Sequence, residues 1–142
     1  MSETYIATAT KTIDAPVAKV WQALTDPQLI RQYLFDTEVV SDWKVGSDIV
    51  YKGEWEGKPF EDKGKILELT PEKRFVSTHW SPLSGVPDLP ENYHTVTYTL
   101  TEKGDQTEVT ISQDNNASED EKAHSEKNWS AALDGMQKLL EK

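Results

Sequence analysis

The chain has 142 residues, which suits one domain, and a net charge of −10 from 25 acidic and 15 basic side chains. Both nucleic acid and anionic membrane surfaces attract positive charge, so this balance disfavours them as partners. The absence of cysteine excludes disulfides, thiolate nucleophiles and thiolate zinc sites. The sequence shows no signal peptide and no apolar run of about 18 residues. We therefore expect a single cytoplasmic domain over residues 1–142, without membrane insertion.

The first part of the chain predicts one strand and two short helices. Tyr5–Ile13 is rich in β-branched residues and alternates in polarity, which indicates a strand. Ala15-Pro16 and Asp26-Pro27 are helix-start signals. Apolar residues then recur at helical spacing, first at Val17, Val20, Trp21 and Leu24 and again at Leu29, Ile30, Tyr33 and Leu34.

The middle of the chain changes to a period of two, which is typical of strands with one face in water. The predicted strands are Ile49–Trp55, Gly64–Leu69, Arg74–Trp80, Tyr93–Thr101 and Glu108–Gln113. Lys103-Gly104-Asp105 predicts a tight hairpin between the last two. The proline-rich segment Ser81–Asn92 is too long for a tight turn, so it is either a binding loop or a plain surface excursion.

The end of the chain predicts a long helix. Ser118 and Glu121 have the spacing of a capping box. An apolar stripe at helical spacing follows, formed by Ala123, Trp129, Ala132, Leu133, Met136 and Leu140. A helix of roughly 23 residues must lay this stripe on an apolar surface, and only the sheet is large enough. We therefore expect an α+β fold in which a curved antiparallel sheet wraps around the C-terminal helix.

This order of elements, together with specific motifs, resembles the SRPBCC superfamily, also called START-like or birch-pollen-allergen-like. Within it, the chain is most similar to the group named after the activator of heat-shock-protein ATPase. The similarity rests on Ala15-Pro16, Val20-Trp21 and Thr25-Asp26-Pro27. Weaker marks are Val45-Gly46, Gly64 with Ile66 and Pro71, and the helix with Trp129, Leu133, Met136 and Leu140.

Two positions depart from the group's pattern. Tyr33 stands where a tryptophan is usual, and Lys127-Asn128 replaces glycines that often precede the last helix's tryptophan. Both bear on the mouth of a cavity and not on the fold. The resemblance implies a helix-grip fold with a cavity between the sheet and the C-terminal helix.

The predicted inward faces mix apolar walls with a few polar tips, as ligand pockets do. The same mixture also fits a closed core whose polar tips are paired. Besides Ile49, Ile66, Val109 and Ile111, these faces hold the candidate ligand-binding residues Tyr51, Trp55, Phe75, Ser77, His79, His94, Val96, Tyr98, Trp129, Leu133 and Met136. Given the resemblance, we expect a cavity there.

Histidine can act in acid–base catalysis or bind a metal, and two histidines fall on the predicted inward face. His79 and His94 show no metal-ligand spacing and no obvious carboxylate partner. No Gly-x-Ser-x-Gly elbow or phosphate-binding loop is present. We therefore assign no catalytic residue, no metal and no cofactor. An enzyme of the cyclase or hydrolase kind, known among relatives with this fold, stays the lesser alternative.

The favoured function is the binding of a small apolar or amphipathic ligand, such as a lipid, a polyketide or an aromatic compound. The group's name implies a second function, interaction with a chaperone. That name describes a larger protein with a separate amino-terminal domain that carries much of the partner contact, and we expect this chain, as a single domain, to lack that part. We therefore expect no measurable stimulation of a chaperone ATPase by this chain.

Overall fold

The computed structural model describes residues 5–33, 36–55, 57–82, 86–116 and 118–141. Its helices are α1 (Val17–Thr25), α2 (Pro27–Tyr33) and α3 (Glu119–Leu140), with a short 3-10 turn, η2 (Pro90–Asn92). Its strands are β1 (Tyr5–Ile13), β2 (Glu38–Ser41), β3 (Asp48–Trp55), β4 (Lys58–Thr70), β5 (Arg74–His79), β6 (His94–Lys103) and β7 (Gln106–Asn116).

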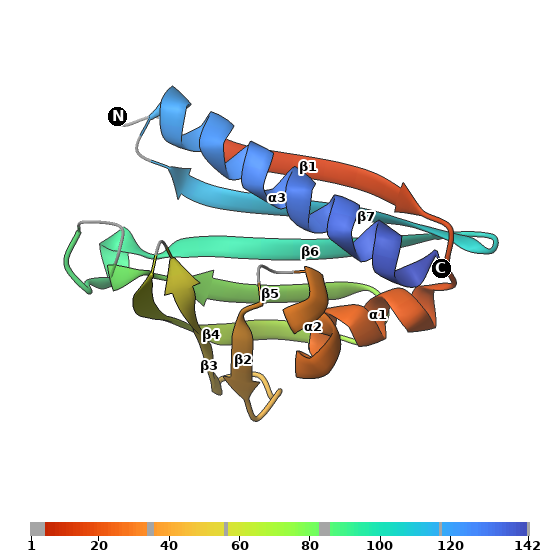
Figure 1. Cartoon of the computed structure of the whole chain (residues 1–142), viewed down its shortest axis with the longest axis horizontal. Helices are drawn as coiled ribbons and strands as arrows, with labels where there is room; N and C mark the ends of the chain where they lie inside the picture. The colour runs from red at the N-terminus through yellow and green to blue at the C-terminus, as the bar shows by residue number, and fades with distance from the viewer. Residues whose placement is uncertain (1–4, 34–35, 56, 83–85, 117, 142) are drawn as a thin grey trace.

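The strands form one antiparallel sheet in the order β1-β7-β6-β5-β4-β3-β2. Helix α3 packs against β1 and β7 and also touches α2, while α1 contacts β6 and β7. Figure 1 shows all three helices on the same side of the sheet, with α3 running along β1 and β7. This arrangement confirms the predicted α+β helix-grip fold.

The structure differs from the sequence prediction at several element boundaries. Strand β2 was not predicted, because four residues are too few to show a period. Strand β4 begins at Lys58 and not at Gly64, since the β3–β4 hairpin extends past the glycine. On α3, Ala123 is exposed and Ser125 is buried, which shifts the amino-terminal end of the predicted stripe.

The helix starts follow the predicted signals, with one shift. Pro16 occupies the cap position before α1 and not the first turn, and no side chain of the described residues caps this helix end. Asp26 Oδ1 accepts a hydrogen bond from the Gln28 N–H at 2.9 Å and so begins α2. Ser118 Oγ accepts from the Glu121 N–H at 3.1 Å, as the capping box predicts for α3.

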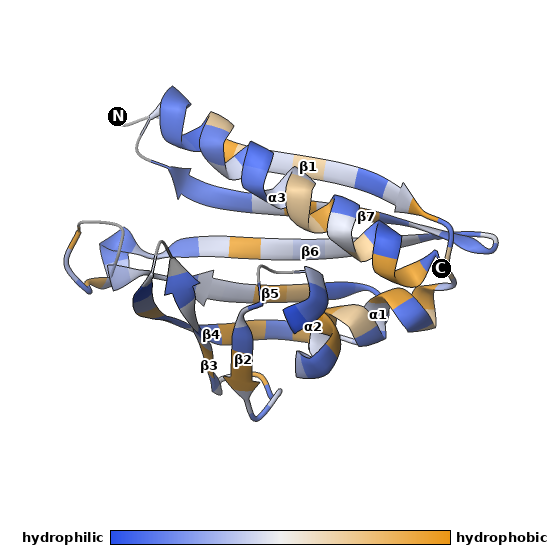
Figure 2. Ribbon diagram, in the orientation of Figure 1, coloured by the Kyte–Doolittle hydropathy of each residue, from blue (hydrophilic) through white to orange (hydrophobic). Residues whose placement is uncertain are grey.

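The core lies between the concave face of the sheet and the helices (Figure 2). In its carboxy-terminal half, α3 contributes the buried side chains of Ala132, Leu133 and Met136. Burial of a side chain such as Leu133 stabilises the fold by about 1.5–3 kcal/mol. The amino-terminal half of α3 buries only Ser125, so it contributes much less to the core.

Strands β4 and β5 approach each other very closely at Gly64. A Cβ atom at this position would lie 1.7 Å from the carbonyl oxygen of Thr78. The next residue of β5 is His79, and the backbone of Lys63 pairs with that of Trp80 through two hydrogen bonds of 2.8 and 2.9 Å. The missing side chain of Gly64 therefore fixes how the end of β5 lies on β4.

We predict that Gly64→Ala lowers the free energy of unfolding by at least about 3 kcal/mol, because the methyl group would overlap backbone atoms that cannot move alone. Lys65→Ala is the matched control, since Lys65 is exposed on the same strand. Urea unfolding of both variants measures the difference. Equal stability of the two variants would contradict this account of the β4–β5 contact.

Three tyrosines of the interior, Tyr33, Tyr51 and Tyr98, lie against or within the core. Burial raises the pKa of the Tyr51 hydroxyl to about 12 and raises the pKa values of Tyr33 and Tyr98 as well. The hydroxyl of Tyr33 donates to the Ala23 carbonyl at 2.8 Å. All three therefore stay protonated in the folded chain at pH values where an exposed tyrosine ionises.

We predict that the free energy of unfolding falls as the pH rises from about 10 to about 12. Above pH 10 the unfolded chain releases tyrosine protons that the folded chain keeps, so alkaline pH favours unfolding. Denaturant titrations across this range, with tyrosinate absorbance as a second signal, measure the effect. Tyr51→Phe should reduce the slope, and a stability independent of pH in this range would refute the prediction.

Candidate functional site

The interior beneath the carboxy-terminal half of α3 is almost filled. The space left there is about 20 Å³, room for about one water molecule. Phe75 stacks on Tyr98 with ring centroids 5.2 Å apart, and Met136 closes the same space from α3. Leu133 is 1% exposed. Phe75, Leu133 and Met136 therefore pack in the core, whereas Tyr98 also borders a second space.

A larger pocket of about 230 Å³ opens beside this core, between the amino-terminal half of α3 and strands β3 to β7. Four of the predicted residues, Tyr51, His79, Val96 and Tyr98, contribute from the sheet, and Trp129 contributes from α3. Sequence reasoning missed the other lining residues, Thr37, Phe60, Asp62, Gln113, Ser125 and Asn128. The side chain of Trp55, also predicted here, lies outside the described part of the chain.

Asp62 and His79 form a hydrogen-bonded pair at the sheet side of this pocket. His79 Nε2 lies 2.9 Å from Asp62 Oδ2, and the two side chains are 28% and 14% exposed. The expectation that His79 has no carboxylate partner is therefore wrong. Asp62 lies on the part of β4 that was not predicted, directly across from Tyr51 of β3. The sequence signal that could have found Asp62 is the period of two along β4, which places Asp62, Gly64 and Ile66 on the same inward face.

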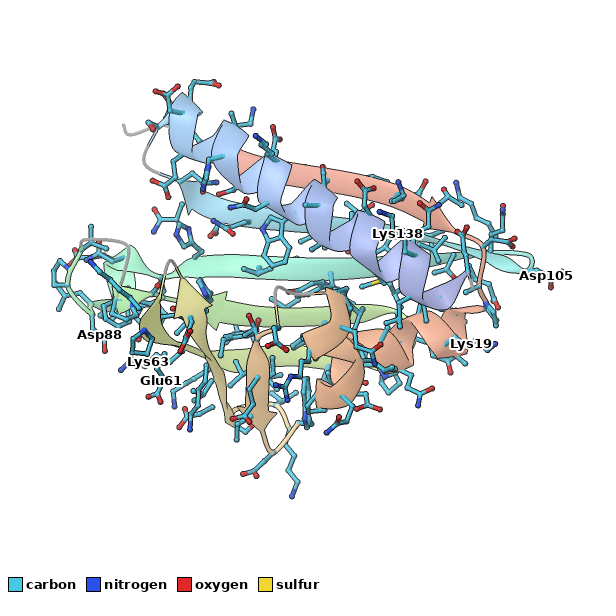
Figure 3. All side chains as sticks on the ribbon, in the orientation of Figure 1. Lys19, Glu61, Lys63, Asp88, Asp105 and Lys138 are labelled. Carbon is cyan, nitrogen blue, oxygen red and sulfur yellow. The ribbon has the colours of Figure 1, made fainter. Side chains whose placement is uncertain are left out.

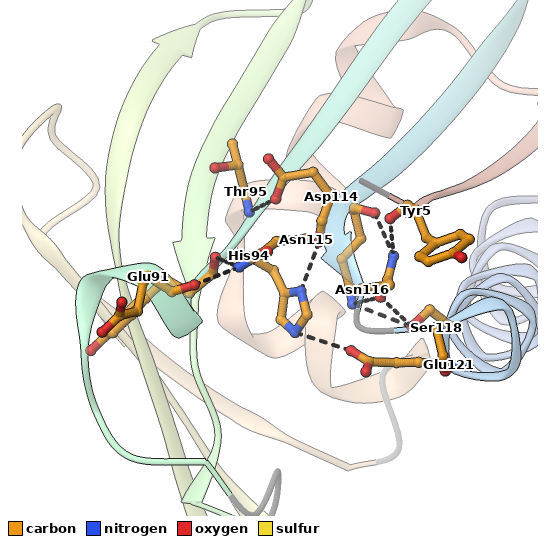
Figure 4. Close-up of polar contacts among 12 residues, drawn as sticks. Tyr5, Glu91, His94, Thr95, Asp114, Asn115, Asn116, Ser118 and Glu121 are labelled. Carbon is orange, nitrogen blue, oxygen red and sulfur yellow. Dashed lines mark hydrogen bonds and ion pairs between the residues drawn. The ribbon is translucent and has the colours of Figure 1, made fainter. Parts of the chain in front are cut away.

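His94 also has a carboxylate nearby, against expectation, but it does not line the pocket. Its Nδ1 lies 2.7 Å from the carbonyl oxygen of Asp114, so Nδ1 carries a proton. Its Nε2 lies 3.7 Å from a Glu121 carboxylate oxygen on α3 (Figure 4). The His79 and His94 rings lie 6.4 Å apart. His94 thus joins the end of β6 to β7 and to the first turn of α3.

Tyr51 contacts both His79 and Ser77. The Tyr51 ring meets His79 edge-on, with centroids 5.6 Å apart. Burial is the main cause of the raised Tyr51 pKa, a hydrogen bond with Ser77 lowers it in part, and the charge of Asp62 raises it further. Ser77 is fully buried. Tyr51 therefore presents a neutral hydroxyl at neutral pH.

The opposite side of the pocket is a network centred on Gln113 of β7. Gln113 Oε1 accepts from the Trp129 indole N–H at 3.0 Å. Gln113 Nε2 donates to Asn116 Oδ1 at 3.1 Å and to Ser125 Oγ at 3.2 Å. These bonds connect β7 to α3 and hold the Trp129 ring edge-on against Tyr98, with centroids 5.8 Å apart.

The described part of the Ser81–Asn92 segment lies elsewhere and does not line this pocket. Asp88 pairs with Lys63 and accepts from the Tyr93 hydroxyl at 2.5 Å. The Tyr93 ring stacks on Trp80, with centroids 6.4 Å apart. These contacts border a separate, open hollow of about 460 Å³ that also includes Val50 and Thr78.

The described residues hold neither a metal-binding cluster nor a membrane-spanning helix. No group of three His, Cys, Asp or Glu side chains among them is arranged to hold a metal ion. Within the same ranges, no helix combines the length and hydropathy that a membrane crossing requires.

Comparison with solved structures identifies proteins with the same fold. A protein of Cytophaga hutchinsonii is 52% identical, with 99% of this chain and 97% of that chain covered and a TM-score of 0.86. DynU16, described as a protein in the dynemicin biosynthetic locus, is 20% identical, with coverages of 96% and 47% and a TM-score of 0.80. The Aha1 dimer from Colwellia psychrerythraea is 22% identical, with both coverages 95% and a TM-score of 0.74.

Comparison by sequence gives the family. A search of curated proteins finds no match. The family described as Activator of Hsp90 ATPase homolog 1-like protein matches residues 14–141, which include the Ala15-Pro16 start and all of α3. Because this match spans most of the chain and a 52% identical protein has the same fold, the chain belongs to the family of Activator of Hsp90 ATPase homolog 1-like proteins.

Proposed function

We propose that the chain binds a small, mainly apolar molecule with one polar end in the pocket of about 230 Å³. The observation that carries this proposal is the composition of the pocket wall. Phe60, Val96 and Trp129 offer apolar surface, and Asp62 and His79 offer polar atoms at one side. Ligand pockets typically hold about 300–1,000 Å³, so a small ligand fits this one best.

The apolar walls can supply the affinity. Burial of about 200 Å² of apolar ligand surface yields about 5 kcal/mol before the costs of association. Gln113 holds the Trp129 ring in place, so this wall needs little further ordering when a ligand binds. We expect dissociation constants that are micromolar or weaker.

The comparisons support a small-molecule role without identifying the molecule. DynU16 shares the fold and is described by its place in a biosynthetic locus, although at 20% identity the likeness extends to the fold alone. Of the ligand classes considered, a lipid, a polyketide or an aromatic compound, small aromatic compounds suit the volume best.

Acid–base chemistry in the same pocket is a second candidate function, favoured by the Asp62–His79 pair. A carboxylate that accepts from one nitrogen of a histidine orients the ring and supports proton transfer at the other. His79→Gln tests this function. A reaction of a bound ligand that this variant abolishes, with binding preserved, would make the pocket an active site.

We predict that Val96→Trp blocks ligand entry. Val96 is 3% exposed, lines the pocket and lies between Ser77 and Gln113 on the neighbouring strands, so an indole there occupies the ligand's space. Thr97→Trp is the matched control, because Thr97 is the next residue of β6 and points to the other face. Titration with benzyl alcohol, followed through the Trp129 indole N–H resonance, should saturate in wild type and in Thr97→Trp only.

Two results would oppose the proposal. One is the absence of saturable binding of benzyl alcohol or larger neutral aromatics to the wild type. The other is equal binding by wild type and a folded Val96→Trp variant, which would locate the ligand elsewhere on the protein.

A further inference from the structure

One oxygen of the Asp62 carboxylate has no partner. Oδ2 accepts from His79 Nε2, whereas Oδ1 is buried and forms no hydrogen bond with any residue that the structure describes. An ionised carboxylate can only accept hydrogen bonds, and buried polar atoms in folded proteins nearly always have a partner. Asp62 therefore carries unused acceptor capacity at an atom that lies just behind the wall of the pocket.

The polar side chains of Gln113 and Ser125, on the other side of the pocket, are already engaged. Both ends of the Gln113 amide are bonded, to Trp129 on one side and to Asn116 and Ser125 on the other. Ser125 Oγ also donates to Asn116 Oδ1 at 3.3 Å. A ligand gains little by competing for these groups, so polar recognition falls to Asp62.

The charge of the pocket has one sign. Asp62 is the only carboxylate among its described lining residues, and none of them is a lysine or an arginine. The neighbours of Asp62 in sequence point to the outside, where Glu61 lies 3.9 Å from Lys52 and Lys63 pairs with Asp88 (Figure 3). A second anion in this pocket would meet Asp62 without a cation to offset it.

We infer that the pocket selects ligands whose polar end is a hydrogen-bond donor, above all a primary amine on an apolar body, and that it rejects carboxylates such as fatty acids. This inference rests on the proposed function. An ammonium group pairs with the Asp62 carboxylate, whose Oδ1 becomes accessible when the side chain turns toward the pocket, while the apolar body lies against Val96 and Trp129. The bond is charge-assisted, which makes it stronger than a bond between neutral groups.

Three probes with the same phenyl and methylene body test the inference, namely benzylamine, benzyl alcohol and phenylacetate. In the wild-type protein, calorimetric or resonance titration should rank benzylamine first and phenylacetate last. We expect benzylamine to bind about tenfold more tightly than benzyl alcohol, as the bond to a charged acceptor implies.

Asp62→Asn keeps the shape of the side chain and can still accept from His79, but it removes the charge. The affinity for benzylamine should fall about 10- to 100-fold, while that for benzyl alcohol should change less than about threefold. Phenylacetate should bind better, because the asparagine amide can donate to it. Glu61→Gln is the matched control, since it removes one charge from the exposed face of the same strand, and it should leave all three affinities unchanged.

The outcomes separate this inference from the proposed function. If benzyl alcohol binds but benzylamine has no advantage, the donor preference is wrong and the pocket remains a ligand site. The donor preference is also wrong if benzylamine keeps its advantage in Asp62→Asn. It is wrong too if Glu61→Gln reduces that advantage as much as Asp62→Asn does. If none of the three probes binds to the wild type, the proposed function fails, and the inference fails with it. Binding of benzyl alcohol to Asp62→Asn also shows that this variant keeps a folded pocket.

Discussion

The site depends on a change of polarity along helix α3. One helix cannot cover a seven-stranded sheet, and α3 is apolar only toward its carboxy-terminal end, where Ala132, Leu133 and Met136 are buried. There it fills the interior with the help of α1 and α2, and almost no space remains. Its amino-terminal half begins with Glu119, Asp120 and Glu121 and buries only Ser125. The pocket opens at this half, because a polar helix surface cannot pack tightly against the sheet.

The two polar sides of the pocket have different energetic roles. Both ends of the Gln113 amide have hydrogen-bond partners within the network. The network therefore fixes α3 to β7 without the free-energy cost of an unpaired polar group. At Asp62, by contrast, a buried oxygen without a partner costs about 1–3 kcal/mol. Features that cost stability, such as an unpaired buried oxygen, are concentrated at the functional sites of folded proteins, where their role in function offsets the cost. This contrast makes Asp62, and not the better-connected Gln113, the centre of recognition.

Much of the fold could be predicted from the sequence, because the signals are local. The capping box at Ser118, the proline starts of α1 and α2 and the alternation in β6 and β7 each involve a few neighbouring residues. The Asp62–His79 pair could not be predicted in the same way. It joins residues 17 positions apart and depends on the β4–β5 register, which Gly64 sets through a close backbone approach. The predicted strand also began at this glycine, so Asp62 was never placed on a face.

A single buried charge decides the ligand class more sharply than the apolar walls do. Folding has already removed Asp62 from most of its water, and His79 donates a hydrogen bond to one of its two oxygens. An incoming donor therefore forms a bond without first having to dehydrate the acceptor, which is the advantage of a preorganised site. An incoming carboxylate would lose its own water and find no donor cation among the described lining residues. The apolar walls provide affinity for either ligand, so the choice between them follows from the sign of the charge at Asp62.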